Sequence, residues 1–184
     1  KRLEFCVDLF MNRIYDPSRK HFNLFFDNEW NSLVEMDSYG HDVETGWLLC
    51  EAARTLENQD LIKRTNLLAL DVTGACLAEG MSDKGYMIYE KKGDRKTKHA
   101  SWWGQIETVI ACVNAWQISG SDVYLQSVDT VWTFVKDHMV DKEYGEWYSD
   151  CFDGEPKKEA PKVSMWRCPY HTVRLGVEMY NRLK

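Results

Sequence analysis

The feature that most constrains this chain is a unit that recurs three times at intervals of roughly 60–68 residues. Each unit has a helix, a short aromatic stretch with a loop, and a second helix that opens with polar and aromatic residues. The three openings read SYGHDVETGWLL (38–49), SWWGQIETVIA (101–111) and RCPYHTVRLGV (167–177). A period this long exceeds that of TPR or HEAT repeats. It predicts pairs of helices arranged as successive copies of one unit.

Hydrophobic periodicity predicts six helices, with the second and fourth apolar around much of their circumference. The fifth has a narrower apolar stripe, and Ser121 is expected to cap its start. Aromatic stretches at 21–27, 85–90 and 145–150 predict strand-like pieces between the helices. The six predicted helices cover 1–14, 42–57, 59–79, 102–119, 121–139 and 170–183.

Alternating inner and outer helices of this kind predict an all-α toroid in which the inner helices line a central cavity. Three units make half of a six-pair ring, so we expect the second half of an (α/α)6 barrel with short β-hairpin loops. The 184 residues form one domain fragment, 1–184. The chain opens inside an amphipathic helix with Leu3, Val7, Phe10 and Ile14 on one stripe. We therefore expect the other half of the barrel to precede Lys1, and the stripe to need a partner from outside this chain or from a neighbouring copy.

Composition argues against two classes of partner, nucleic acids and membranes. A net charge of −6 with dispersed lysines and arginines argues against a nucleic-acid partner, and no apolar run is long enough for a membrane span. Cys50, Cys76 and Cys112 lie in apolar helical segments, so we expect buried free thiols and a cytoplasmic, reducing location. Eight tryptophans and nine tyrosines serve packing or provide flat platforms for sugars.

Polar residues at the three helix openings are expected at one end of the helix array. His41 and Glu44 share a helix face, His171 opens the last helix, and Trp102, Trp103 and Glu107 open the middle one. Two histidines, carboxylates and tryptophans around one cavity predict acid/base chemistry on a sugar.

Ordinary structural roles remain open for the same residues. His41, Asp42 and Glu44 could serve the helix N-terminus, and His171 alone could be a structural histidine. Trp47 is expected in the core. Trp102 and Trp103 are adjacent, so we expect only one of them to face inward.

The remaining histidines, His21, His99 and His138, have no supporting neighbours in the sequence and are assigned to surface or packing. The run Lys91–Lys98 is expected to be a solvated loop. No HxH or HExxH spacing predicts a metal site, and no GxGxxG or P-loop predicts a nucleotide cofactor.

The motifs SYGHDVETGWLLCEAA, SWWGQIETVIACVNAWQISG, YGEWY and WRCPYH resemble the C-terminal half of the cellobiose 2-epimerases, in the N-acylglucosamine 2-epimerase superfamily. The resemblance runs from about Leu3 to the C-terminus. It implies an (α/α)6 barrel that inverts C2 of the reducing-end glucose of a β-1,4-linked disaccharide without a cofactor.

By this resemblance His41 and His171 are the catalytic histidines and Glu44 is the carboxylate that orients His41. Trp166, Glu107 and one of Trp102 and Trp103 contact the substrate. Gln105 favours the disaccharide enzymes, because the N-acylglucosamine epimerases tend to carry histidine there. The further site residues of the family lie in the N-terminal half, so we expect this half alone to be inactive.

The implied reaction opens the sugar ring, removes the C2 proton and returns a proton to the other face of a cis-enediolate. Three alternatives stay open. One is an N-acylglucosamine 2-epimerase, another is an aldose–ketose isomerase of the same superfamily, and the third is a non-catalytic carbohydrate-binding barrel.

Overall fold

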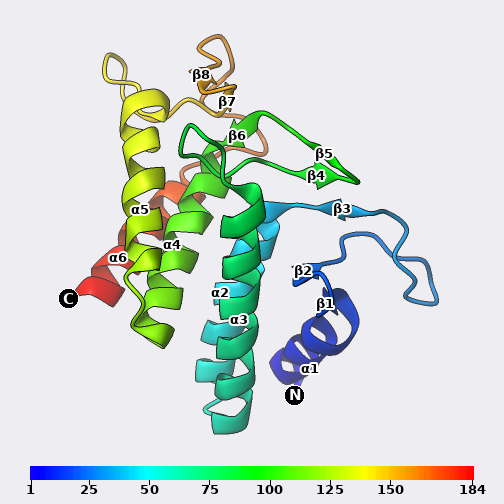
Figure 1. Ribbon diagram of the computed structural model, residues 1–184. Coiled ribbons are helices and arrows are strands. Elements are labelled where there is room, and N and C mark those ends of the chain that lie inside the picture. Colours follow the sequence, from blue (N-terminus) through cyan, green and yellow to red (C-terminus); the bar gives the residue numbers. More distant parts are fainter.

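The computed structural model describes residues 1–184 and contains six α-helices joined by short strands and loops (Figure 1). The helices are α1 (Arg2–Leu9), α2 (Tyr39–Thr55), α3 (Gln59–Gly80), α4 (Trp102–Ser119), α5 (Val123–Phe134) and α6 (Tyr170–Leu183). A π-helical turn extends α1 over Phe10–Ile14, and another extends α5 over Val135–Met139.

Helix α4 lies at the centre of the fold. It packs against α2, α3, α5 and α6, and all twelve residues from Gly104 to Ala115 are buried. Ser101 caps its start by accepting a hydrogen bond from the Gly104 amide at 3.3 Å, and Gly120 ends it in the left-handed conformation (φ 71°). The helix is apolar around much of its circumference, as its sequence predicts, and its few buried polar side chains include Gln105 and Glu107.

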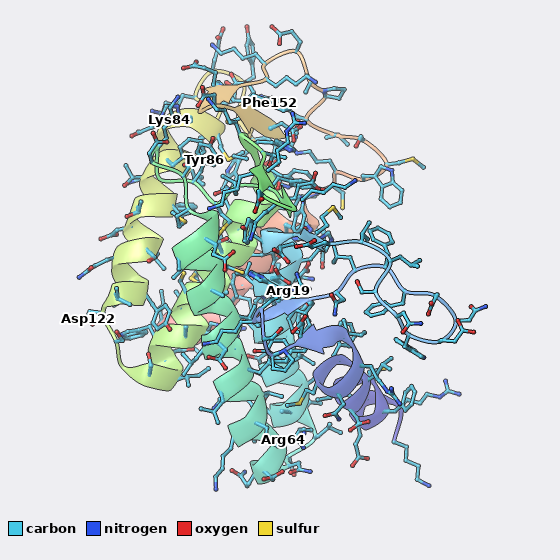
Figure 2. The ribbon with its side chains drawn as sticks, turned by 45° about the vertical axis from the view of Figure 1, so that its right-hand side comes forward. Arg19, Arg64, Lys84, Tyr86, Asp122 and Phe152 are labelled. Carbon is cyan, nitrogen blue, oxygen red and sulfur yellow. The ribbon has the colours of Figure 1, made fainter.

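Eight strands form three small antiparallel sheets. They are β1 (Tyr15–Asp16), β2 (His21–Phe22), β3 (Met36–Asp37), β4 (Lys91–Lys92), β5 (Arg95–Lys96), β6 (His99–Ser101), β7 (Asp150–Phe152) and β8 (Glu155–Pro156). The sheet orders are β1-β2, β3-β4-β5 and β6-β7-β8. The last two sheets gather at the upper ends of the helices in Figure 1. Figure 2 shows Lys84 and Phe152 at this end and Arg64, near the start of α3, at the opposite end.

All six predicted helices are present, and α3, α4 and α6 start at the predicted residues. Helix α2 begins at Tyr39 instead of 42, and α5 begins at Val123 instead of 121, so Ser121 is not its cap. The predicted strand at 85–90 is wrong. Tyr86, Met87 and Ile88 are buried in succession, which a half-buried strand does not allow, and Met87 makes only an isolated bridge to Met81.

The other two aromatic stretches contribute little to the sheets. Only His21–Phe22 and Asp150 of the predicted pieces lie in strands. The lysine run, expected to be a solvated loop, instead pairs as the β4–β5 hairpin and joins β3. Lys91 faces inward there, with its Nζ 3.2 Å from Glu79 and 3.7 Å from Asp37.

The apolar stripe of α1 is mostly covered by this chain itself. Val7 is buried, and Phe10 and Ile14 pack against the core, so the expectation that the stripe needs an outside partner is wrong for these residues. Leu3 stays exposed. The larger exposed apolar face lies on α6, at Val173, Val177, Tyr180 and Leu183.

Cys50, Cys76 and Cys112 are buried free thiols, as predicted, and the chain contains no disulfide. No helix in the structure combines the length and apolarity needed to cross a membrane.

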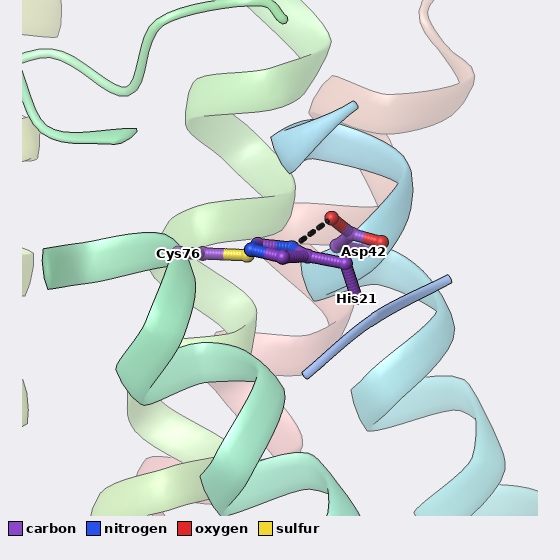
Figure 3. A group of neighbouring side chains, drawn as sticks. All are labelled: His21, Asp42 and Cys76. Atoms are coloured by element: carbon purple, nitrogen blue, oxygen red, sulfur yellow. Dashed lines mark hydrogen bonds and ion pairs between the residues drawn. The ribbon is translucent and has the colours of Figure 1, made fainter. Parts of the chain in front are cut away.

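His21 joins strand β2 to the start of α2, and it has the neighbour that the sequence did not reveal. Its Nδ1 lies 2.7 Å from Asp42, whose other oxygen accepts from the Phe22 amide at 2.9 Å. The imidazole lies between the Asp42 carboxylate and the Cys76 thiol (Figure 3). This buried pair fixes the first turn of α2, where His41 is the residue before Asp42.

Candidate active site

A cavity of about 410 Å³ opens where α2, α4 and α6 begin, beside the β6–β7 ladder. The helix openings therefore do meet at one end of the fold. The cavity is lined by His41, Glu44, Tyr89, His99, Ser101, Trp102, Trp103, Asp150, Trp166 and His171. Six of these ten residues are ones that the sequence predicts at the site.

His41 lies in the first turn of α2, and its Nδ1 is 2.8 Å from the hydroxyl of Ser38. The centre of its ring is 4.7 Å from the ring of Trp103. Gly40 permits this approach, because a Cβ there would lie 2.7 Å from the Trp103 ring. The glycine is thus required by the close packing of α2 on α4.

His171 lies in the first turn of α6 and faces the same tryptophan, with ring centres 5.7 Å apart. Its Nδ1 donates a hydrogen bond to Glu107 Oε1 at 2.6 Å. Because a carboxylate only accepts, the proton must be on Nδ1. Nε2 is then the ring nitrogen that remains for proton exchange.

Glu107 has a different place from the one expected. It was predicted to bind substrate, but it is fully buried below the cavity and does not line it. Besides His171, it accepts hydrogen bonds from Trp47 Nε1 at 2.9 Å and from Arg174 Nη1 at 3.0 Å. Glu107 therefore holds other side chains in position, and the core residue Trp47 supports it.

Glu44 was expected to orient His41, and this expectation is wrong. Its Oε1 instead accepts a hydrogen bond from Arg174 at 2.5 Å and lies 3.4 Å from the Tyr170 hydroxyl. Arg174 thus bridges Glu44 and Glu107. The sequence contains a signal for Arg174, since it follows His171 by three residues and so shares its helix face.

The cluster of Glu44, Glu107 and His171 resembles a metal site, because its ligand-type atoms lie within 4.8 Å of one another. However, the Arg174 guanidinium bonds both carboxylates and supplies the positive charge at this point. The Arg174 guanidinium therefore occupies the role that a bound cation would have beside these two carboxylates.

Strand pairing builds the second wall of the cavity. Ser101 is opposite Asp150 in the β6–β7 register, while Ala100 is opposite Cys151. Because side chains alternate along a strand, Ala100 and Cys151 are buried in the core and their neighbours face the other side. His99 and Asp150 both reach the cavity in this way.

His99 was assigned to surface or packing, and the structure corrects this. Its Nε2 donates to Asp150 Oδ1 at 2.6 Å, and its ring lies between Tyr89 (4.7 Å) and a stacked Phe152 (4.8 Å). Burial favours the neutral acid, but the hydrogen bond from His99 keeps the pKa of Asp150 below its usual value. In the sequence, the alternation of His99 and Ser101 just before α4 could have indicated that His99 faces the site. No comparable local pattern indicates Asp150.

Both Trp102 and Trp103 line the cavity, which contradicts the expectation that only one could. Trp102 also packs against the core and has the Arg167 guanidinium 5.0 Å from its ring. Arg167 is buried, which lowers its pKa, and it donates to the carbonyl oxygen of Trp147 at 2.5 Å. This contact fixes the loop that places the 85% exposed Trp166 at the cavity rim.

Gln105 does not reach the cavity. Its side chain accepts from the Met87 amide and donates to the Met87 carbonyl, each at 2.8 Å. Gln105 therefore replaces the strand partner that the 85–90 segment lacks, and it influences the site only through that segment.

Comparison with known proteins identifies the family. A family model described as N-acylglucosamine 2-epimerase (GlcNAc 2-epimerase) matches residues 1–174. The chain belongs to the N-acylglucosamine 2-epimerase family. Every residue that lines the cavity lies within the matched span.

Relatives within this family are cellobiose 2-epimerases. The chain is 35% identical to the enzyme of Dictyoglomus turgidum, covering 100% of this chain and 47% of that protein. It is 38% identical to the enzyme of Bacteroides fragilis, covering 97% of this chain and 46% of that protein. The resemblance predicted from the motifs is therefore confirmed.

A solved structure has the same fold. The sugar epimerase from a ruminal bacterium superposes with a TM-score of 0.94 at 33% identity, covering 98% of this chain and 47% of that chain. The chain thus spans about half the length of the family members it matches.

Proposed function

We propose that this chain is one half of an (α/α)6 barrel that inverts C2 of the reducing-end glucose of cellobiose or a related β-1,4 disaccharide. His41 and His171 exchange the protons, and no cofactor takes part. The observation that carries the proposal is the position of both imidazoles in one cavity, each in contact with the ring of Trp103.

The reaction needs a proton removed from one face of C2 and a proton returned to the other. Opening of the sugar ring exposes an aldehyde, which acidifies the C2 proton. Removal of that proton gives a cis-enediolate that is planar at C2. Two separately held imidazoles suit this exchange, because histidine acts as either acid or base near neutral pH.

The two histidines have different support. The buried carboxylate of Glu107 fixes the tautomer of His171, whereas His41 has the hydroxyl of Ser38, which can donate or accept. Trp103 lies against both imidazoles and offers a flat face to the sugar between them. Trp166 offers a second face at the rim.

The alternatives differ in where the proton returns or in which sugar is bound. Return to C1 of the same enediolate gives a ketose, which is aldose–ketose isomerisation. Gln105 is buried and makes no direct contact with a substrate in the cavity. Its identity therefore does not favour a disaccharide through such a contact.

Solvent labelling tests the proposal in the complete protein. Incubated with cellobiose in deuterated water, it should form the 2-epimer with deuterium at C2. His41→Ala and His171→Ala should each lower turnover by about 10²–10⁴-fold. The matched control is His138→Ala, which removes an imidazole outside this cavity and should keep activity. An unlabelled epimer, or near-normal turnover in either site variant, would rule out two-histidine catalysis; a ketose product would favour the isomerase.

A further inference from the structure

We propose that the His99–Asp150 pair, with the ring of Tyr89, forms a second sugar-binding position that holds the non-reacting ring of a disaccharide. This inference rests on the proposed function and specifies which residues select a disaccharide over a single sugar. Neither the resemblance in the sequence nor the orientation of the two histidines assigns a role to this pair.

The location supports a second position in the same cavity. Trp103 contacts His171 and His41, Tyr89 lies 6.1 Å from Trp103, and His99 lies 4.7 Å from Tyr89. The pair is therefore separated from the two proposed catalytic imidazoles by Trp103 and Tyr89 along the wall. A ligand with one sugar ring between the histidines needs a second ring to reach it.

The chemistry of the pair fits sugar hydroxyl groups. Asp150 Oδ1 takes the hydrogen bond from His99, and the Ser149 side chain also bonds this carboxylate. Because an ionised carboxylate has about four acceptor positions on its two oxygens, Asp150 can still accept from a sugar hydroxyl. Hydrogen bonds to a charged carboxylate are roughly twice as strong as neutral ones. Tyr89 adds an aromatic face beside the pair, which is the usual combination in carbohydrate sites of apolar platform and few polar groups.

The pair is also held rigid before any ligand binds. The His99 imidazole lies between Tyr89 and Phe152, and the ladder beneath it is anchored by the fully buried Ala100 and Cys151. A polar pair that is already ordered loses little entropy on binding. Because Ala100 and Cys151 already anchor the ladder, the sheet has core packing that does not depend on the His99–Asp150 contact.

Two neighbours offer matched controls. His138 stacks on Phe134 with ring centres 4.8 Å apart, as His99 does on Phe152, but it lies outside this cavity. Asp153 lies just beyond β7 and pairs with Lys84 at 3.1 Å and with a second lysine, also outside the cavity. His138→Gln and Asp153→Asn therefore remove the same chemical groups from the same region.

The test compares the affinities of cellobiose and glucose in the complete protein by calorimetry. His99→Gln and Asp150→Ala should each weaken cellobiose binding by about tenfold or more, and should reduce the preference for cellobiose over glucose by a similar factor. Asp150→Asn should recover part of the loss. His138→Gln and Asp153→Asn should keep the wild-type preference, and near-ultraviolet circular dichroism checks that every variant is folded.

Several results would overturn the proposal. One is a wild-type protein that binds cellobiose no better than glucose, and another is a preference that survives in both site variants. Equal losses for both sugars would show that the pair only shapes the cavity. If the preference depends on the pair but no epimer forms in deuterated water, the proposed reaction fails while the second sugar position stands.

Discussion

Glu107 lies beneath His171, not in the cavity: its Oε1 accepts the Nδ1 hydrogen bond at 2.6 Å, and its side chain has no exposed surface. A group that contacts a proposed catalytic imidazole on the side away from the cavity affects the reaction by orienting the ring and by its charge.

Glu107→Gln should lower kcat by about 10²-fold with little change in KM, because the amide no longer enforces one tautomer of His171. The pH dependence of kcat should also shift, which a purely structural loss would not cause. The control is Glu51→Gln in α2, because Glu51 pairs with Arg54 and Arg182 away from the cavity. An unchanged pH profile in Glu107→Gln would argue against the orienting role.

Arg174→Met should lower the free energy of unfolding by about 3–5 kcal/mol, because it leaves the buried Glu107 carboxylate without its cation. Adding Glu107→Gln should recover part of that loss, and chemical denaturation of both variants measures it. Arg64→Met is the comparison: its ion pair with Asp60 is long (4.0 Å) and exposed, so the cost should stay below about 1 kcal/mol. Equal losses for the two arginines would contradict the bridging role.

Gly40→Ala should reduce activity without unfolding the protein. The new methyl group would lie 2.7 Å from the Trp103 ring, so the ring must move away from His41. Kinetics and tryptophan fluorescence report this displacement. Gly74→Ala in α3 is the matched control, since a Cβ there meets nothing within 4 Å; it should stabilise the helix by about 0.5–1 kcal/mol and keep activity.

The buried His21 should make stability depend on pH. Burial disfavours its charged form, but the hydrogen bond and charge of Asp42, helped by Asp37 and Glu79, outweigh this and raise its pKa. The stabilisation is therefore fully present below the ordinary histidine pKa of about 6.5 and is lost as pH rises through the higher folded value.

Urea midpoints measured across that window check the sign. The wild-type midpoint should fall as pH rises, and the His21→Gln variant should show a flatter profile. His138→Gln should retain the wild-type slope. A wild-type midpoint that instead rises through this window would show that His21 is held neutral.

The sequence by itself determined the helices, their repeat and the residue types at each helix start. Hydrophobic periodicity is a local property, so the six helices could be predicted with starts shifted by at most a few residues. The three repeat openings also placed His41, Trp103 and His171 correctly at one cavity, because equivalent points of a repeated unit lie at the same end of the array.

Only the tertiary structure decided which side chains meet. Asp150 comes to His99 from 51 residues away through strand pairing, and a one-residue change of register would turn it away from the cavity. Arg174 takes Glu44 away from its expected partner His41, because its guanidinium also reaches Glu107 from α6. Contacts between elements depend on register and helix rotation. A single sequence shows neither the strand register nor the rotation of the helices. The residue types at the site could therefore be predicted, but not which side chains pair with one another.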